Sequence, residues 1–291
     1  MKRYGGFTAV KDLSFDVPEG ALFAFLGENG AGKSTTIGCI TTTLSPTSGT
    51  VRVCDRDVLA DPNEVRRNIG VVFQQSLLDP LLSVRENLTT RARFYGLERR
   101  EAARRLSELS DTVGLEEVLD RRYGVLSGGQ KRRADIARAL VHEPRVIFLD
   151  EPTAGLDPQS REHIWAAIAR LRSEHSTTVF LTTHYMEETE RADQVCIIAR
   201  GEIVAQGTPA ELRSAHSSSV LTVRAADTAS LLSACDERGL MAEAAGDTVR
   251  IPVDGVDQAK AVLLLPGITD FEFRHGTMDD VFLSVTRERA A

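Results

Sequence analysis

A glycine-rich loop carrying a lysine and two hydroxyl residues follows a short apolar run near the start of this 291-residue chain. The run Ala21–Leu26 (ALFAFL) leads into Gly27–Thr35 (GENGAGKST), which fits the pattern G-x-x-x-x-G-K-S/T. Glycines let backbone N–H groups turn inward around phosphate oxygens, and the following helix adds its positive N-terminal end. We expect Lys33 to reach the β- and γ-phosphates of a nucleotide and the Ser34 hydroxyl to bind Mg²⁺. The expected nucleotide contacts are Gly27, Glu28, Asn29, Gly30, Ala31, Gly32, Lys33, Ser34 and Thr35.

Two carboxylates end another apolar run, Val146–Glu151 (VIFLDE). Asp150, at the carboxyl end of that strand, is positioned to hold Mg²⁺ directly or through water. Glu151 is then the base that orients and deprotonates an attacking water. Taken alone, the pair is equally consistent with a solubilising turn. Together with the phosphate loop, it predicts nucleotide hydrolysis.

A second anion-binding segment opens a later helix. Leu126–Gln130 (LSGGQ) places a hydroxyl and two glycines at a helix start, where backbone N–H groups attract anions. The residues expected to bind a nucleotide there are Ser127, Gly128, Gly129 and Gln130. One γ-phosphate does not need two complete sets of backbone N–H donors from a single chain. This favours a head-to-tail homodimer in which each LSGGQ segment closes over the ATP of the partner.

Strands that alternate with helices must position these loops. Apolar runs at Ala21–Leu26, Arg145–Leu149 and Thr177–Leu181 have the length and flanks of buried strands. Between the last two runs, apolar residues recur at i, i+4 and i+7 on one helix face, at Ile164, Ile168 and Leu171. This pattern predicts an α/β fold with a parallel sheet covered on both faces. Asp193–Gly207 is then expected to form a hairpin that turns at Arg200 and Gly201.

The last part of the chain has a different order of elements. Thr208–Glu211 (TPAE) supplies an N-cap, a proline at the first helical position and an acidic residue three positions after the cap. A serine run at Ser217–Ser219 then resembles a linker, and the pattern beyond it is βαββαβ with a final helix. That order is typical of a small ferredoxin-like α+β domain. We therefore expect a nucleotide-binding domain over residues 1–207 and an accessory domain over residues 208–291.

Composition restricts the class of protein. The net charge of −7 argues against a general nucleic-acid binder, so we expect no nucleic-acid partner. Apolar runs such as Ala261–Leu265 are far shorter than a membrane span. The four cysteines are scattered with no CxxC pair, which favours a reduced, cytoplasmic protein.

LSGGQ is also the signature of the ATP-binding-cassette (ABC) ATPases, which this chain resembles from Tyr4 to Gly207. The resemblance implies a P-loop NTPase core with an antiparallel β subdomain and an α-helical subdomain at about residues 85–143. It also implies ATP and Mg²⁺ as cofactors. Gln74 matches the glutamine that contacts Mg²⁺ and water while sensing the membrane partner. His184 matches the switch histidine that binds the γ-phosphate.

The resemblance assigns two further roles and shows two departures. Asp157 matches the loop that crosses the dimer interface, and Tyr4 matches the aromatic residue that stacks on adenine. Family members carry further residues before the Tyr4 position, so either the first strand of the antiparallel subdomain is missing or the native start differs. We therefore expect Tyr4 to be poorly held. Asp55 replaces a common turn glycine, and Asp tolerates positive φ better than most residues.

The C-terminal run His275–Leu283 (HGTMDDVFL) is similar to the tail of drug-exporter ATPases of the daunorubicin-resistance type. This second resemblance implies an ATPase subunit for efflux of a drug-like or lipophilic substrate, working with a separate membrane permease. Such a subunit is cytoplasmic and peripheral on the inner face of the cell membrane. The alternatives are a soluble ABC ATPase that is not a transporter and a regulatory nucleotide-binding module. The identity of the substrate is not encoded in these residues.

Overall fold

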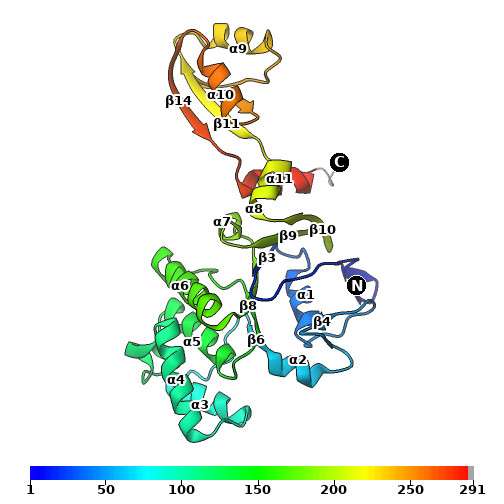
Figure 1. The fold of residues 1–291 in the computed structure, drawn as a ribbon, viewed down its shortest axis with the longest axis vertical. Coiled ribbons are helices and arrows are strands. Elements are labelled where there is room, and N and C mark those ends of the chain that lie inside the picture. Colours follow the sequence, from blue (N-terminus) through cyan, green and yellow to red (C-terminus); the bar gives the residue numbers. More distant parts are fainter. Residues whose placement is uncertain (288–291) are drawn as a thin grey trace. The chain divides into compact units, whose positions relative to one another are not determined.

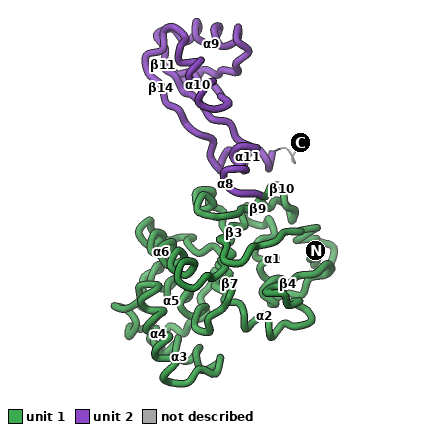
Figure 2. The backbone as a smooth tube through the Cα atoms, viewed as in Figure 1, with its two compact units in different colours: residues 1–206 green, residues 207–291 purple. Residues whose placement is uncertain are grey.

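The computed structural model describes residues 1–287, which form two compact units that meet at Gln206 and Gly207 (Figures 1 and 2). The first unit contains a six-stranded sheet, and the second contains a four-stranded antiparallel sheet. The first unit is therefore the mixed α/β structure that the alternation of strands and helices predicts.

The six-stranded sheet has the order β10-β9-β3-β8-β7-β6. Its strands are β3 (Leu22–Leu26), β6 (Ile69–Val72), β7 (Val146–Asp150), β8 (Thr178–Thr183), β9 (Gln194–Ala199) and β10 (Glu202–Gly207). The pairs β6–β7, β7–β8, β3–β8 and β3–β9 are parallel. Because parallel strands have the same direction, their carboxyl ends gather the phosphate loop, the acidic pair and His184 at one edge.

Seven helices of the first unit surround this sheet. They are α1 (Lys33–Ile40), α2 (Pro62–Asn68), α3 (Val84–Phe94), α4 (Arg99–Val113), α5 (Gly128–Leu140), α6 (Pro158–His175) and α7 (Met186–Thr189), with short 3₁₀ turns at Glu116–Val118 and Tyr123–Val125. Figure 1 shows α1 and α2 on one side of the sheet and α5 and α6 on the other. Both faces are covered, which explains why the central strands are apolar throughout. The aromatic core includes Phe23, Phe148 and Phe180.

Besides the β9–β10 hairpin and an isolated antiparallel bridge between Ser83 and Arg122, the first unit contains two short antiparallel ladders. Strand β1 (Lys2–Tyr4) pairs with β2 (Phe7–Val10), and β4 (Arg52–Val53) pairs with β5 (Arg56–Asp57). The turn between β4 and β5 has φ of 48° at Cys54 and 64° at Asp55, so the predicted positive φ of Asp55 is confirmed. Leu13, Phe15 and Val17 pack against the core cluster from a segment that forms no strand.

The start of the chain is tied down by backbone contacts. Met1 N donates to Ser48 O over 3.0 Å, and Arg3 N donates to Thr47 Oγ1 over 3.0 Å. These bonds and the β1–β2 ladder place Tyr4 in a strand. The expectation of a poorly held Tyr4 is therefore wrong, because residues after the first helix supply the partners that the sequence pattern does not reveal.

The hairpin predicted at residues 193–207 is present as β9 and β10. Arg200 and Gly201 form its two-residue turn, with φ of 51° and 79°. Positive φ at both positions matches the twist of the flanking strands. No helix within residues 1–287 is long and apolar enough to cross a membrane.

The second unit follows the predicted order of elements. It contains α8 (Pro209–His216), β11 (Ser219–Ala225), α9 (Thr228–Asp236), β12 (Glu243–Ala245), β13 (Thr248–Val253), α10 (Val256–Leu263), β14 (Ile268–Arg274) and α11 (Met278–Arg287). The sheet order is β12-β13-β11-β14, and each neighbouring pair is antiparallel. Its own core includes Leu221, Val249 and Ile251.

The predicted cap begins the second unit, and a similar cap begins its last helix. Thr208 caps α8 in a capping box with Glu211, and Thr277 and Asp280 exchange the equivalent bonds at the start of α11. The serine run is not a free linker, however. Ser217 Oγ donates to Arg213 O over 2.7 Å, and Ser219 already belongs to β11.

Candidate active site

The phosphate loop is shaped by glycines that no other residue could replace without strain. Gly30 and Gly32 have φ of 84° and 109°, a region that side chains disfavour. A Cβ on Gly27 would lie 2.5 Å from Ile198 O, so the loop passes directly over β9. Helix α1 begins at Lys33 with Gly32 as its N-cap, which directs its first N–H groups toward the loop.

Lys33 folds back into the loop. Its side chain is 5% exposed, and its Nζ donates to Gly27 O over 2.6 Å and to Glu28 O over 3.2 Å. The same Nζ lies 3.5 Å from Glu151 Oε1. Burial lowers the pKa of Lys33, and the negative charge of Glu151 opposes this shift. The ammonium group is therefore poorly solvated and available to a stronger anion.

Glu151 is the centre of the polar cluster. Its carboxylate accepts a hydrogen bond from Gln74 Nε2 over 2.9 Å and lies 3.3 Å from His184 Nδ1. The His184 contact lacks hydrogen-bond geometry and is a close approach of the ring to the carboxylate. Burial acts to raise the pKa of Glu151, but His184, Lys33 and Gln74 together outweigh it and keep this pKa below its usual value. Glu151 is therefore ionised here.

The backbone of Glu151 is held in an uncommon conformation. Its φ is 47°. Its N–H donates to the carbonyl oxygen of Thr182 over 3.2 Å and to the hydroxyl oxygen of the same residue over 3.1 Å. A non-glycine residue at positive φ stores strain that the surroundings must compensate. The bonds to β8 fix the carboxylate at the edge of the sheet, beside the phosphate loop.

Asp150 and Ser34 form the part of the site that fits Mg²⁺. Ser34 Oγ lies 3.4 Å from Asp150 Oδ2, and Thr182 Oγ1 donates to Asp150 Oδ1 over 2.6 Å. Hydroxyl and carboxylate oxygens are the ligands that Mg²⁺ uses in proteins, completed by water and substrate phosphates. No cluster of three or more His, Cys, Asp or Glu side chains within residues 1–287 could hold a metal. The hydroxyl of Ser34 and the carboxylate of Asp150 are donors of the kind that Mg²⁺ binds.

The LSGGQ segment lies at the start of α5. Ser127 caps this helix in a capping box with Gln130: Gln130 N donates to Ser127 Oγ over 3.3 Å, and Ser127 N donates to Gln130 Oε1 over 3.0 Å. A Cβ on Gly129 would overlap Ser160 of α6, whereas one on Gly128 would meet only Leu156 Cδ2, at 3.4 Å. Gly129 therefore serves the packing of α5 on α6, and Gly128 has no such role within the chain.

Two other candidate residues stand apart from the cluster. Asp157 caps α6, accepting from Ser160 N over 2.9 Å. Tyr4 is 46% exposed, with Lys2 Nζ 5.1 Å from its ring. The structure thus brings together Lys33, Ser34, Gln74, Asp150, Glu151 and His184, and joins neither Tyr4, Asp157 nor the LSGGQ segment to them by a described contact.

Arg132 is a buried residue that the sequence reasoning missed. It is 9% exposed and donates to Phe73 O over 2.6 Å, to Pro152 O over 3.0 Å and to Glu151 O over 2.9 Å. Burial lowers its pKa. One guanidinium group therefore joins the segment before Gln74 to the segment around Glu151. Its place inside the basic run Lys131–Arg133 hid this role, because such runs are usually solvated.

The loop after Gln74 is tied to α5 by a second buried group. Ser76 Oγ donates to Asp135 Oδ1 over 2.6 Å, and Tyr123 OH donates to Asp135 Oδ2 over 3.1 Å. Burial raises the pKa of Asp135 and raises that of Tyr123 to about 12. The position of Gln74 thus depends on side chains of the helical segment.

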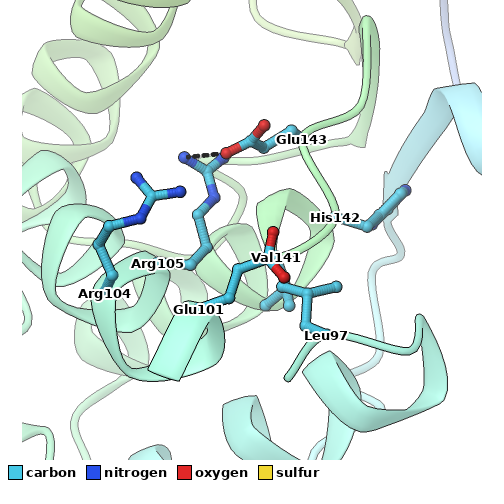
Figure 3. Close-up of a pocket in the computed structure, with 7 residues that line it drawn as sticks. All are labelled: Leu97, Glu101, Arg104, Arg105, Val141, His142 and Glu143. Atoms are coloured by element: carbon cyan, nitrogen blue, oxygen red, sulfur yellow. Dashed lines mark ion pairs between the residues drawn. The ribbon is translucent and has the colours of Figure 1, made fainter. Parts of the chain in front are cut away.

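A small cavity of about 70 Å³ lies between α4 and the end of α5, and Figure 3 shows the residues around it. It contains none of the candidate site residues. His142 lines it, stacks on Tyr95 with ring centroids 3.9 Å apart, and has its Nε2 2.9 Å from Ile69 O. These contacts give His142 a structural role.

Known proteins resemble the chain in sequence and in fold. A family profile described as ABC transporter matches residues 10–154. The daunorubicin/doxorubicin resistance ATP-binding protein DrrA of Streptomyces peucetius is 40% identical over 300 residues, covering 98% of this chain and 90% of that protein. The Nod factor export ATP-binding protein I of Burkholderia orbicola is 37% identical over 289 residues, covering 98% of this chain and 94% of that protein.

Solved structures agree with these relatives. The cbiO1 protein from Clostridium perfringens, part of the ABC transporter complex cbiONQ, matches 70% of this chain and 83% of that chain with a TM-score of 0.66 and 32% identity. A dimeric post-hydrolysis structure of the ATP-binding cassette MJ0796 with ADP and Pi matches 69% of this chain and 91% of that chain, with a TM-score of 0.64 and 31% identity.

Proposed function

The chain belongs to the ABC transporter family, and we propose that it hydrolyses ATP to drive efflux of a drug-like or lipophilic substrate through a separate membrane permease. It is an ATPase, as its family and its structural neighbours are. The observation that carries the proposal is the convergence on Glu151. Lys33, Gln74 and His184, from three separate segments, all reach its carboxylate at the mouth of the phosphate loop.

The proposed chemistry follows from that cluster. The phosphates of ATP compete with Glu151 for the ammonium group of Lys33, because a triphosphate carries more charge than a carboxylate. Once Lys33 turns to the phosphates, Glu151 is free to orient the attacking water and to accept its proton. Gln74 positions the water, and His184 donates to the γ-phosphate. Ser34 and Asp150 would hold Mg²⁺, which would supply positive charge to offset that of the phosphates.

We propose a head-to-tail homodimer in which each LSGGQ segment faces the ATP of the partner. Its support is that Ser127, Gly128 and Gln130 have no described contact with the phosphate loop of their own chain. Two structures of MJ0796, at 31% identity to this chain, are dimeric. Asp157, two residues after Gly155, lies on the turn that would cross the interface. Closure would pull on the permease through the Gln74 segment, and hydrolysis would reset it.

The exporter assignment rests on the names of the relatives, which concern daunorubicin/doxorubicin resistance and Nod factor export. A permease partner would place the chain in the cytoplasm, at the inner face of the cell membrane.

We also propose that residues 208–291 form a ferredoxin-like accessory domain. Its support is the βαββαβ order from β11 to β14 and the sheet order β12-β13-β11-β14.

The variant Glu151→Gln tests the proposed chemistry. An amide of the same shape cannot accept the proton of the water, so we expect ATP hydrolysis to fall by about a thousandfold. ATP binding should be kept or strengthened, because Lys33 loses a competing anion. Calorimetry measures the affinity, phosphate release measures the rate, and sedimentation should detect ATP-bound dimers. Glu174→Gln, on the exposed face of α6, is the control. Near-normal turnover of Glu151→Gln would contradict the role of Glu151.

A further inference from the structure

A buried carboxylate outside the nucleotide cluster bridges two loops of the site. Glu188 lies on α7 and is 4% exposed. It accepts hydrogen bonds from the hydroxyl groups of Thr153, two residues after Glu151, and of Thr183, the residue before His184; the Thr183 bond is 2.7 Å long. Thr183 Oγ1 also accepts from Tyr185 N over 2.9 Å. One side chain thus links the segment after Glu151 to the loop that carries His184.

Arg161 of α6 makes a second bridge between the same two segments. Its Nε donates to Leu156 O over 3.1 Å, and its guanidinium carbon lies 4.8 Å from the ring centroid of Tyr185. The Tyr185 ring is in turn 4.0 Å from the His184 ring, centroid to centroid. Arg161 is therefore bound to the turn that precedes Asp157 and rests on the neighbour of the switch histidine.

The residues that these two bridges hold are hydrogen-bonded to the backbone of the catalytic cluster. Thr183 O accepts from Gly27 N over 3.3 Å at the start of the phosphate loop. Ala154 N donates to Glu151 O over 3.3 Å. Glu188 and Arg161 make no described contact with Lys33, Ser34, Asp150 or the carboxylate of Glu151. Their effect on the reaction would therefore pass through residues that they position.

We propose that Glu188 and Arg161 are positioning residues that couple the turn Thr153–Asp157 to the loop of His184 within one subunit. The inference rests on the proposed function, in which this turn meets the partner subunit. When the partner displaces the turn, the two bridges move the His184 loop with it. His184 then reaches the γ-phosphate while Glu151 is in place to orient the attacking water, so that hydrolysis waits for dimer closure.

Physical chemistry favours a coupling role for Glu188 over a purely stabilising one. Replacing a buried charge and its partners by apolar groups of similar volume often leaves stability unchanged or raises it. Hydrogen bonds to a carboxylate, however, are shorter and stronger than neutral ones and hold their partners in one geometry. A link of this kind transmits displacement between two segments.

The test compares two buried threonines of the same neighbourhood. Thr153→Val removes one hydroxyl that binds Glu188. Thr189→Val is the matched control: Thr189 is fully buried on α7, and its Oγ1 donates to Met186 O over 2.6 Å within the same helix. Both variants lose one buried hydrogen bond and gain a methyl group, but Thr153→Val alone cuts the bridge. Glu188→Gln, which keeps the volume and one acceptor oxygen, provides a third variant.

We expect kcat for ATP hydrolysis to fall about tenfold in Thr153→Val with KM for ATP within about twofold, because the loss is one of alignment. Thr189→Val should keep the kcat of the wild type, and Glu188→Gln should lie between the wild type and Thr153→Val. Adding Arg161→Met to Thr153→Val should lower kcat further, because the bridges act in parallel.

Equal losses of kcat in Thr153→Val and Thr189→Val would overturn the proposal, as would wild-type kcat in Thr153→Val. Thermal unfolding curves, recorded for each variant, should place every assay well below its Tm. Failure of the proposed function is distinguishable: in that case the wild-type chain itself does not hydrolyse ATP, and the coupling proposal falls with it.

Discussion

At the scale of single residues, the nucleotide site is a competition for the ammonium group of Lys33. Two loop carbonyls and the Glu151 carboxylate hold that group. The bond to Gly27 O, at 2.6 Å, must break before Lys33 can reach a phosphate. Phosphate oxygens carry the charge needed to displace a neutral carbonyl. The lysine thus couples nucleotide entry to the release of Glu151.

Lys33→Ala tests this competition directly. Without the ammonium group the loop keeps its backbone donors but loses a cation that we propose reaches the phosphates. We expect ATP affinity to fall by at least about a hundredfold, measured by calorimetry. Lys11→Ala, at an exposed lysine paired with Glu202, should bind ATP as the wild type does. Unchanged affinity in Lys33→Ala would contradict the role of the loop.

Sequence and structure differ most at this scale. The residue types of the phosphate loop and the acidic pair are predictable because each directly follows an apolar strand, whereas the role of His184 was expected only from the family resemblance. The supporting side chains have no such signal. Thr182 reaches Asp150 and Glu151 only because β7 and β8 are neighbours in the sheet. Arg132 reaches four backbone carbonyls only because α5 packs beside the strand ends.

At the scale of elements, the two glycines at the start of α5 have different roles, one in helix packing and one in the proposed binding of phosphate. Gly129 faces Ser160 of α6 too closely for any side chain, whereas Gly128 meets only Leu156, at 3.4 Å. The two glycines look equivalent in the sequence. Their surroundings make one a packing residue and leave the other open toward the proposed partner.

The two alanine variants should therefore fail in different ways. Gly129→Ala should lower the free energy of unfolding by about 1–3 kcal/mol through overpacking. Gly128→Ala should change it by less than about 1 kcal/mol but lower ATP hydrolysis at least about tenfold, because a methyl group blocks close approach of phosphate to the backbone. Urea unfolding and phosphate release measure the two effects. Full activity in Gly128→Ala would argue against LSGGQ as a phosphate-binding segment.

The contact between α3, β6 and the end of α5 gives the fold a sensitivity to acid. Burial, together with the charges of Arg91, Arg105 and Arg138, lowers the pKa of His142 to about 4 from 6.5. Between pH 6.5 and pH 4, His142 is therefore protonated in the unfolded chain and neutral in the folded chain. This contribution to stability is complete above about pH 6.5 and is lost as the pH falls from 6.5 toward 4.

His142→Gln removes the titrating group and keeps a donor for Ile69 O. Between pH 7 and pH 5 the wild type should lose about 1–2 kcal/mol more unfolding free energy than the variant. Urea unfolding at the two pH values measures this difference. Equal losses in both proteins would show that His142 is not the buried neutral group.

At the scale of the whole molecule, the chain is two units with separate cores. Apolar periodicity and caps predict the central strands and the 193–207 hairpin of the first unit and the order of elements in the second, as the capping box of Thr208 and Glu211 illustrates. The helical segment and the antiparallel pairs of the first unit were expected only from the family resemblance. Segment 13–17 has alternating apolar residues but packs on the core without a strand partner, because side-chain periodicity does not specify hydrogen-bond partners.

The central claim is that each catalytic site needs Glu151 of one chain and LSGGQ of another. Mixing two inactive variants tests it most directly. Glu151→Gln lacks the base, and Ser127→Arg blocks the LSGGQ segment, so each homodimer has no complete site. A mixed head-to-tail dimer has one complete site, formed by Glu151 of the Ser127→Arg chain and Ser127 of the Glu151→Gln chain. An equimolar mixture should therefore regain about a quarter of the wild-type rate of ATP hydrolysis, since half of the dimers are mixed and each has one of two sites intact. A mixture no more active than the separate variants would contradict the account.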